Sequence, residues 1–144
     1  MLIAELNQHP RYAEQTARLP HTEWSYLPAW SHPPTILERL KQRNQATSAE
    51  FTLIATPDGE TVIATCSLIR YELDDIAARE YWIGEMVTDK RFRGQGVAKA
   101  LIQQAIAQAI KQQISELWLC TPDQQTYYQR SGWQAVEQRV KRSR

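Results

Sequence analysis

The sequence has little of the chemistry that binds metals or forms disulfides. Its two cysteines, Cys66 and Cys120, lie in apolar stretches typical of strands, and neither has a partner at zinc-site or redox-pair spacing. We therefore expect both to be buried, inert thiols. His9, His21 and His32 are eleven or twelve residues apart, a spacing that offers no pair of metal ligands on one helix face. We expect no metal site.

The sequence also lacks an excess of charge of one sign and any long hydrophobic run. Its formal net charge is +1, so no overall field favours nucleic acid or a membrane surface. No apolar run reaches the ~18 residues of a membrane helix, and the N-terminus lacks the apolar core of a signal peptide. We expect a cytoplasmic protein that binds neither nucleic acid nor membrane. Basic residues near the end are interpreted as a solvated tail: Arg139, Lys141, Arg142 and Arg144.

No repeat or low-complexity linker divides the chain, and its composition is that of an ordinary folded protein, so we expect one domain over residues 1–144. Hydrophobic patterning and turn residues predict strands over residues 2–6, 51–56, 61–71, 81–88 and 116–120, and a last strand from Trp133. The turn at residues 57–60 predicts a hairpin, and the strand at 116–120, apolar on both faces, suits the interior of a sheet. Helices are predicted from Pro10 to Leu19 and over residues 35–44, 97–112 and 123–130. This order predicts an α/β fold with a mixed sheet of about six strands and four helices.

The segment Arg91-Phe92-Arg93-Gly94-Gln95-Gly96-Val97-Ala98 joins an apolar strand to a helix. Two glycines two residues apart let the backbone turn tightly and bring its N–H groups close to a bound group. The helix that follows adds unpaired N–H groups and the positive end of its dipole. A loop of this kind favours a phosphate or a pyrophosphate.

Two common phosphate-binding patterns do not fit this loop. No Lys-Ser or Lys-Thr follows the glycines to meet a β/γ-phosphate and magnesium. The third glycine of a dinucleotide-binding fold is missing, and so is an acidic residue about twenty positions on at a strand end to hold a ribose. Taken alone, the loop is also compatible with a plain turn between a strand and a helix.

Two motifs together resemble the GNAT acyltransferase superfamily. The first is Arg93-Gly94-Gln95-Gly96-Val97-Ala98-Lys99-Ala100-Leu101, which resembles the family's pyrophosphate loop and helix. The family pattern Gln/Arg-x-x-Gly-x-Gly/Ala fits from Arg91 to Gly96 and also from Arg93 to Ala98. About thirty residues on, Tyr127-Tyr128-Gln129-Arg130-Ser131-Gly132-Trp133 is similar to the second signature. The resemblance to the family extends over residues 51–133. Segments 82–84 and 121–123 are similar to an uncharacterised bacterial subgroup, which indicates no substrate. The family resemblance implies a single-domain GNAT-like fold with a mixed, mostly antiparallel twisted sheet.

The resemblance implies acetyl-CoA, or another acyl-CoA, as the donor, without a metal. Backbone N–H groups from Gly94 to Lys99 would hold the pyrophosphate, and strand residues would pair their backbone with the pantetheine arm. Arg93 and Lys99 would add charge or be simply solvated. Thr88 and Lys90 stand where many members carry an apolar residue and proline, so the register of the contacts is open by a residue or two. The implied cofactor-binding residues are Met86, Val87, Thr88, Arg93, Gly94, Gln95, Gly96, Val97, Ala98 and Lys99.

The resemblance also implies direct acyl transfer, in which an amine attacks the thioester and the CoA thiolate leaves. Tyr128 occupies the family position of a hydroxyl that protonates or hydrogen-bonds this thiolate. The alternative is a packed tyrosine, which is the role expected for Tyr127. Glu85, a carboxylate in a mostly apolar strand, is the first candidate for the base that receives the amine proton, and Glu80 is the second. A water as base, or a Glu85 that is solvated or paired with an arginine, stays open.

The acceptor is less constrained by the sequence. Carboxylates near the expected mouth of the site favour a cationic acceptor: Glu72, Asp74, Asp75, Glu80 and Glu85. The aromatic and proline-rich segment 24–34 either lines the acceptor pocket or caps the core. The favoured function is an acetyl-CoA-dependent N-acetyltransferase acting on a primary amine of a small molecule, a peptide or a protein. The alternative is a non-catalytic acyl-CoA-binding module that regulates or scaffolds a partner. Because eleven residues follow Trp133, we expect a sheet edge that is exposed or covered by a partner, which is compatible with a homodimer.

Overall fold

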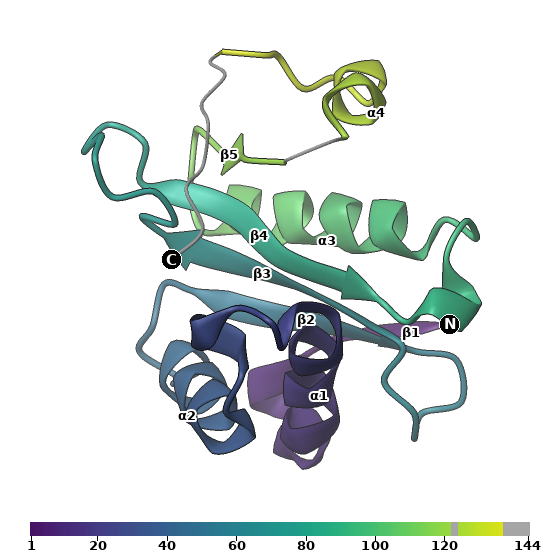
Figure 1. Cartoon of the computed structure of the whole chain (residues 1–144). Coiled ribbons are helices and arrows are strands. Elements are labelled where there is room, and N and C mark those ends of the chain that lie inside the picture. Colours follow the sequence, from purple (N-terminus) through teal and green to yellow (C-terminus); the bar gives the residue numbers. More distant parts are fainter. Residues whose placement is uncertain (122–123, 137–144) are drawn as a thin grey trace.

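The computed structural model describes residues 1–121 and 124–136, and its strands form one sheet (Figure 1). The strands are β1 (Leu2–Glu5), β2 (Phe51–Thr56), β3 (Ala64–Arg70), β4 (Tyr81–Thr88) and β5 (Trp118–Leu119), in the order β1-β2-β3-β4-β5. The first four pair antiparallel, whereas β4 and β5 pair in parallel. The predicted α/β fold with a mixed, mostly antiparallel sheet is confirmed.

Helices cover both faces of this sheet. The α-helices of the described residues are α1 (Ala13–Trp24), α2 (Pro33–Arg43), α3 (Val97–Lys111) and α4 (Gln125–Arg130). Short 3-10 turns are η1 (Leu6–Gln8), η2 (Pro10–Tyr12), η3 (Pro28–Trp30) and η4 (Lys90–Phe92). Helices α1 and α2 lie on one face and α3 on the other, with α4 beyond β5 (Figure 1). Helix α1 continues past the predicted end at Leu19 because Pro20 is buried against the core, and this packing offsets its missing N–H. None of these helices combines the length and the apolarity that a membrane crossing requires.

The core has one layer on each side of the sheet. Residues of α3 pack on β2, β3 and β4, and the buried members include Leu53, Leu68, Ile83, Leu101 and Ala105. On the other face, α1 and α2 pack on β2 through Tyr12, Ala17, Ile36, Leu40 and Ile54. Both faces of the sheet are therefore covered by packed helices. Strand β4 lies next to β5, the short strand at one edge of the sheet.

The hairpin between β2 and β3 is confirmed, and Asp58 organises its turn. The Asp58 carboxylate accepts hydrogen bonds from the N–H groups of Glu60 at 2.9 Å and Thr61 at 2.8 Å, and from the hydroxyl of Thr56 at 3.1 Å. The backbone bonds from Thr61 and Glu60 are the main cause that lowers the pKa of Asp58 from 3.8 to about 2. Gly59 beside it adopts a φ of +80°.

This lowered pKa predicts a specific acid sensitivity. The folded state prefers the ionised carboxylate, so the contribution of Asp58 to stability is present above its unfolded pKa of 3.8 and is lost as the pH falls toward about 2. We expect Asp58→Asn to unfold at a lower temperature than the natural protein at neutral pH, with the difference shrinking as the pH falls. Thermal unfolding from pH 2 to 7 measures this, and Asp74→Asn in an exposed loop is the control. A difference that did not change with pH would contradict the assignment.

Other expectations about the C-terminal part of the chain were wrong. Strand β5 has two half-buried residues and is the last strand of the sheet among the described residues, not an interior one. Cys120, predicted to be buried, is exposed because it follows the end of β5, whereas Cys66 is buried and its pKa is raised to about 12 by burial and then by Glu72. Residues 133–136 form no strand, and the rest of the predicted last strand lies outside the described residues, as does the basic tail.

Candidate functional site

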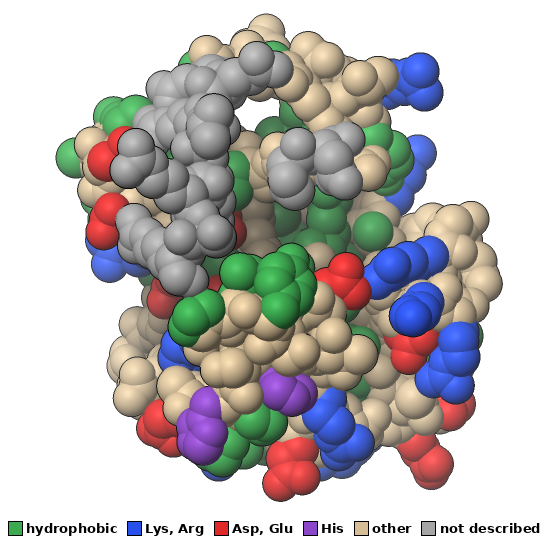
Figure 2. All heavy atoms as spheres, viewed as in Figure 1, with side chains coloured by type: hydrophobic (Ala, Val, Ile, Leu, Met, Phe, Trp, Pro, Cys, Tyr) green, Lys and Arg blue, Asp and Glu red, His purple; other side chains and the backbone are tan. Residues whose placement is uncertain are grey.

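Strand β4 has one fully paired edge and one edge that is largely open. Strand β3 pairs with it along its whole length, whereas β5 pairs only with Trp82 and Ile83. Past Ile83 the second edge of β4 has no strand partner in residues 1–121 and 124–136, because β5 and α4 lead away from it (Figure 1). The space-filling view shows a hollow in the upper half of the molecule with hydrophobic side chains at its floor (Figure 2). This edge of β4 is therefore free to pair with another extended group.

The open edge of β4 begins at a β-bulge. Thr65 pairs with Val87 and Ser67 pairs with Gly84, so Glu85 and Met86 together lie opposite a single residue of β3. Glu85 has a φ of +49°, in the left-handed region that side chains with a Cβ rarely adopt. A bulge re-aims the backbone and increases the local twist of a strand. The peptide groups after Gly84 therefore point in directions that a regular strand would not give them.

The glycine loop follows β4 directly and leads into α3. Gly94 and Gly96 have φ values of +76° and +80°, and Gly96 is the N-cap of α3. The N–H of Ala100 donates to the carbonyl of Gly96 at 3.1 Å, but the N–H groups from Gly94 to Lys99 find no acceptor among the described residues. A Cβ added at either glycine would meet no atom within 4 Å, so the space beside the loop is open. Free N–H groups at the positive end of a fifteen-residue helix fit a pyrophosphate.

Arg93 and Lys99, the two cations expected beside a pyrophosphate, lie in different surroundings. Arg93 donates from Nε to the carbonyl of Thr88 at 3.0 Å and from Nη2 to the carboxylate of Glu23 at 2.7 Å. It therefore fastens the loop both to the end of β4 and to α1. Lys99 is exposed on the first turn of α3. Within the described residues, the side chain of Arg93 is engaged in these contacts, whereas the ammonium group of Lys99 is available to a bound anion.

Tyr128 lies on α4, across a pocket from α3. The pocket has a volume of about 260 Å³ and is lined by Lys99, Ile102, Gln103, Ile106, Tyr127, Tyr128, Arg130, Ser131 and Trp133. The Tyr128 ring is half-buried against the core and makes edge contacts with Tyr127 at 5.1 Å and Trp133 at 6.5 Å between centroids. The pocket thus joins the first turn of α3 to Tyr128. Tyr127, which was expected in the core, is 41% exposed because its neighbour takes the inward position on this short helix.

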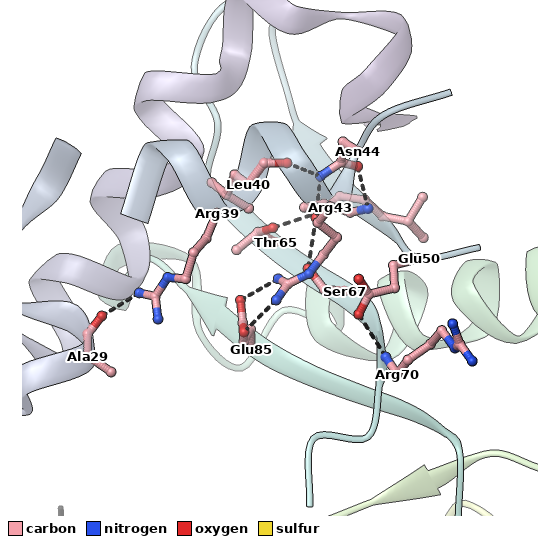
Figure 3. A network of polar contacts seen from close by, with 12 residues as sticks. Ala29, Arg39, Leu40, Arg43, Asn44, Glu50, Thr65, Ser67, Arg70 and Glu85 are labelled. Atoms are coloured by element: carbon pink, nitrogen blue, oxygen red, sulfur yellow. Dashed lines mark hydrogen bonds and ion pairs between the residues drawn. The ribbon is translucent and has the colours of Figure 1, made fainter. Parts of the chain in front are cut away.

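The two candidate bases are both paired with arginines. Glu85 at the bulge accepts from Arg43 at 2.6 and 3.0 Å (Figure 3). Glu80 accepts from Arg70 at 2.8 Å. Glu80 precedes β4, so it lies at the opposite end of that strand from the glycine loop. The structure therefore brings Glu85, and not Glu80, next to the open edge of β4. The described residues contain no group of three or more His, Cys, Asp or Glu placed to hold a metal ion.

Sequence reasoning missed Arg43 at the bulge, and it named Glu72 only as a carboxylate near the mouth, without its contact with Gly84. Arg43 ends α2 and shows no motif that would link it to β4. The carboxylate of Glu72 lies so close to Gly84 that a Cβ there would be 2.6 Å from Oε2. A glycine in the middle of an apolar strand is a usual sign of such a close approach, so Gly84 was the available signal.

The aromatic segment between α1 and α2 divides into two parts. Trp30 packs against the core layer of α1 and α2, contacts Trp24 at 5.3 Å between ring centroids, and has the guanidinium of Arg39 over its face at 4.6 Å. Tyr26 is 78% exposed. The tryptophans therefore cap the core, whereas Tyr26 belongs to the surface.

Comparisons with known proteins agree with this architecture. The sequence profile of the acetyltransferase (GNAT) family matches residues 14–133, and a search of curated proteins gave no match. An aminoglycoside antibiotic 6′-N-acetyltransferase from Acinetobacter haemolyticus has a TM-score of 0.74 and 22% identity, with 100% of this chain and 98% of that chain covered. Glucosamine-6-phosphate N-acetyltransferase from Arabidopsis thaliana has a TM-score of 0.70 and 14% identity, with 98% and 96% covered. An aminoglycoside 6′-N-acetyltransferase in complex with coenzyme A has a TM-score of 0.64 and 12% identity, with 83% and 61% covered.

The family assignment rests on the sequence profile, since the identities to the solved structures are low and their likeness concerns the fold. The matched residues run from the start of α1 to Trp133 and include both the glycine loop and Tyr128. Acetyl-CoA is the donor that this family uses. This chain therefore belongs to the acetyltransferase (GNAT) family and is an acyltransferase.

Proposed function

We propose that this protein transfers the acetyl group of acetyl-CoA directly to a primary amine of a small molecule, a peptide or a protein. One observation carries the proposal: the open backbone edge of β4 leads directly into a glycine loop whose N–H groups lack acceptors in the described part of the chain. An extended carrier that ends in a diphosphate has the two features that these neighbouring elements would bind.

In this proposal the N–H groups from Gly94 to Lys99 bind the pyrophosphate, helped by the dipole of α3 and the charge of Lys99. The peptide groups of Met86, Val87 and Thr88 pair with the amides of the pantetheine arm. Arg93 holds the loop against Thr88, and so keeps the two binding elements in register. The open space beside both glycines supports this fit, because a bulky anion must approach the backbone closely.

Acetyl-CoA supplies a thioester carbonyl that a neutral amine can attack. We assign Tyr128 as the acid whose hydroxyl gives a proton to the departing sulfur. We assign Glu85 as the first candidate to receive the amine proton, directly or through a water, and Glu80 as the second. Glu85 is preferred because it lies at the bulge, next to the edge where the donor would bind.

An amine acceptor has two kinds of support. All three similar structures reported above are named as N-acetyltransferases, two of aminoglycosides and one of glucosamine-6-phosphate. In this chain, five carboxylates lie in the loop before β4 and on β4: Glu72, Asp74, Asp75, Glu80 and Glu85. Arginines pair with Glu80 and Glu85, so the preference for a cationic amine rests on the carboxylates of the loop.

The proposal is tested by measuring binding and chemistry separately. We expect CoA to bind with a micromolar dissociation constant, roughly −7 to −8 kcal/mol, in a calorimetric titration. We also expect at least one member of a panel of amines, including amino sugars, polyamines and lysine peptides, to release free thiol from acetyl-CoA. Absence of both heat and a thermal shift with CoA would exclude the donor. Binding of CoA without thiol release for any amine would contradict the amine acceptor.

A further inference from the structure

Arg43 joins helix α2 to the bulge of β4. It is the last residue of α2, and its side chain is only 12% exposed. Its Nη1 donates to Oε1 of Glu85 at 2.6 Å, and its Nη2 donates to Oε2 at 3.0 Å (Figure 3). A two-point contact of this kind fixes direction as well as distance, because the planar guanidinium must match the carboxylate.

The end of α2 is itself fixed to the sheet. The Asn44 side chain donates to the carbonyl of Leu40 at 2.9 Å and accepts from the N–H of Thr52 at 2.8 Å. The buried hydroxyl groups of Thr52 and Ser67 lie 2.9 Å apart and share a hydrogen bond. Arg43 therefore starts from a backbone that is tied to β2 and β3, so its guanidinium reaches β4 from a fixed origin.

The surroundings keep Arg43 charged. Burial alone would lower the pKa of its guanidinium, but the contact with Glu85 and the nearby charges of Glu50 and Glu72 outweigh burial and raise the pKa above its usual value. The guanidinium of Arg43 is therefore charged across the pH range in which enzymes work.

Glu85 needs a restraint because of its backbone. Its φ of +49° places it in a region that residues other than glycine avoid, since the Cβ crowds the carbonyl oxygen. In addition, two residues of β4 oppose one residue of β3 at the bulge, so the regular hydrogen-bond ladder is interrupted there. The ion pair with Arg43 supplies a restraint at the point where the ladder supplies none.

We propose that Arg43 is a positioning residue for acetyl transfer. Its ion pair with Glu85 stabilises the bulge of β4, and the bulge orients the peptide groups of Met86 and Val87 along the open edge that receives the donor. This inference rests on the proposed function, because it assigns a purpose to the direction of those groups. It concerns the backbone of residue 85, and is separate from any use of the Glu85 carboxylate as a base.

Substitution of Glu85 by glycine can replace the restraint that Arg43 supplies, because glycine adopts a positive φ without a steric penalty. We expect Arg43→Lys, which keeps the charge but loses the two-point contact, to bind CoA about 10-fold more weakly, as it would if the bulge held its shape about a tenth of the time. Arg43→Met should weaken binding at least as much. The double variant Arg43→Met/Glu85→Gly leaves no unpaired charge, and we expect its CoA affinity to return to within about 3-fold of the natural protein.

Calorimetry with CoA, with the fold checked by circular dichroism, gives the affinities without any catalytic step. Lys41→Met is the matched control, because it removes an exposed positive charge from the same turn of α2 and should leave the affinity unchanged. Natural affinity in Arg43→Lys would overturn the inference. Loss of CoA affinity in the double variant would also overturn the inference. The double variant tests the inference even if Arg43→Met alone does not fold. If the natural protein itself binds no CoA, the proposed function fails and this role of Arg43 fails with it, whereas the two results above overturn the role of Arg43 alone.

Discussion

The Gly96→Val variant is expected to lose about 100-fold or more in affinity for CoA, roughly 3 kcal/mol, while it keeps its fold. Gly96 has a φ of +80° and caps α3 at the point where the N–H groups of the loop are free. A valine side chain there would meet no protein atom within 4 Å, so packing alone does not prevent folding. It would instead occupy the space through which a diphosphate must approach the backbone, and its branched Cβ would disfavour the left-handed conformation.

Backbone strain must be separated from blocked binding in this experiment, and the chain offers a matched glycine for that purpose. Gly59 at the tip of the β2–β3 hairpin also has a φ of +80°, and a Cβ there likewise meets nothing within 4 Å. Gly59→Val should therefore lose a similar amount of thermal stability but bind CoA normally. Calorimetry and thermal unfolding of both variants measure the two effects. Equal CoA affinity in Gly96→Val and the natural protein would mean that the loop is only a turn.

The Tyr128→Phe variant is expected to turn over about 10- to 100-fold more slowly, at or below the usual range for an acid–base group, with little change in CoA binding. The ring packs against Tyr127 and Trp133 and touches the core, and phenylalanine preserves those contacts. The substitution therefore removes a proton donor without removing the packing. Thiol release at saturating donor measures the chemical step, provided that an active amine has been found.

The leaving group supplies the control for Tyr128. A thiolate from a more acidic thiol leaves without help from an acid, so the difference between Tyr128→Phe and the natural protein should shrink with an acetyl thioester of such a thiol. An equal defect with both donors would point to misplaced substrate instead of a missing proton. Equal turnover of the two proteins with acetyl-CoA would remove Tyr128 from the mechanism.

The features predicted correctly are those that short segments determine. The turn at residues 57–60 and the strand-forming segments on either side of it produce the hairpin of β2 and β3. The glycines before an apolar helical stripe produce the loop and α3, because their left-handed conformations need no support from the rest of the fold. Gly132, with a φ of +97°, ends α4 in the same way.

The features missed depend on contacts between distant segments. Arg43 and Glu85 are 42 residues apart, and nothing in either neighbourhood indicates the other. Alternation along β4 predicts which side chains share a face, but it does not reveal a bulge, which shifts the face of every residue after it. The exposure of Cys120 and Tyr127 was missed because apolar patterning alone does not tell how far β5 and α4 extend beyond the sheet.

The short pairing of β4 with β5 has a consequence for how the protein can open locally. Strands β1 to β4 pair in sequence and are packed on both faces, whereas β5, within the described residues, pairs with β4 at two positions, Trp82 with Trp118 and Ile83 with Leu119. Widening the gap between β4 and α4 therefore disturbs these two pairs and the packing of Leu119 and Tyr128 on the core, and leaves the pairing of β1 to β4 intact. The free energy of such a local opening is a fraction of that of global unfolding. A local opening on this side of β4 thus does not require the rest of the protein to unfold.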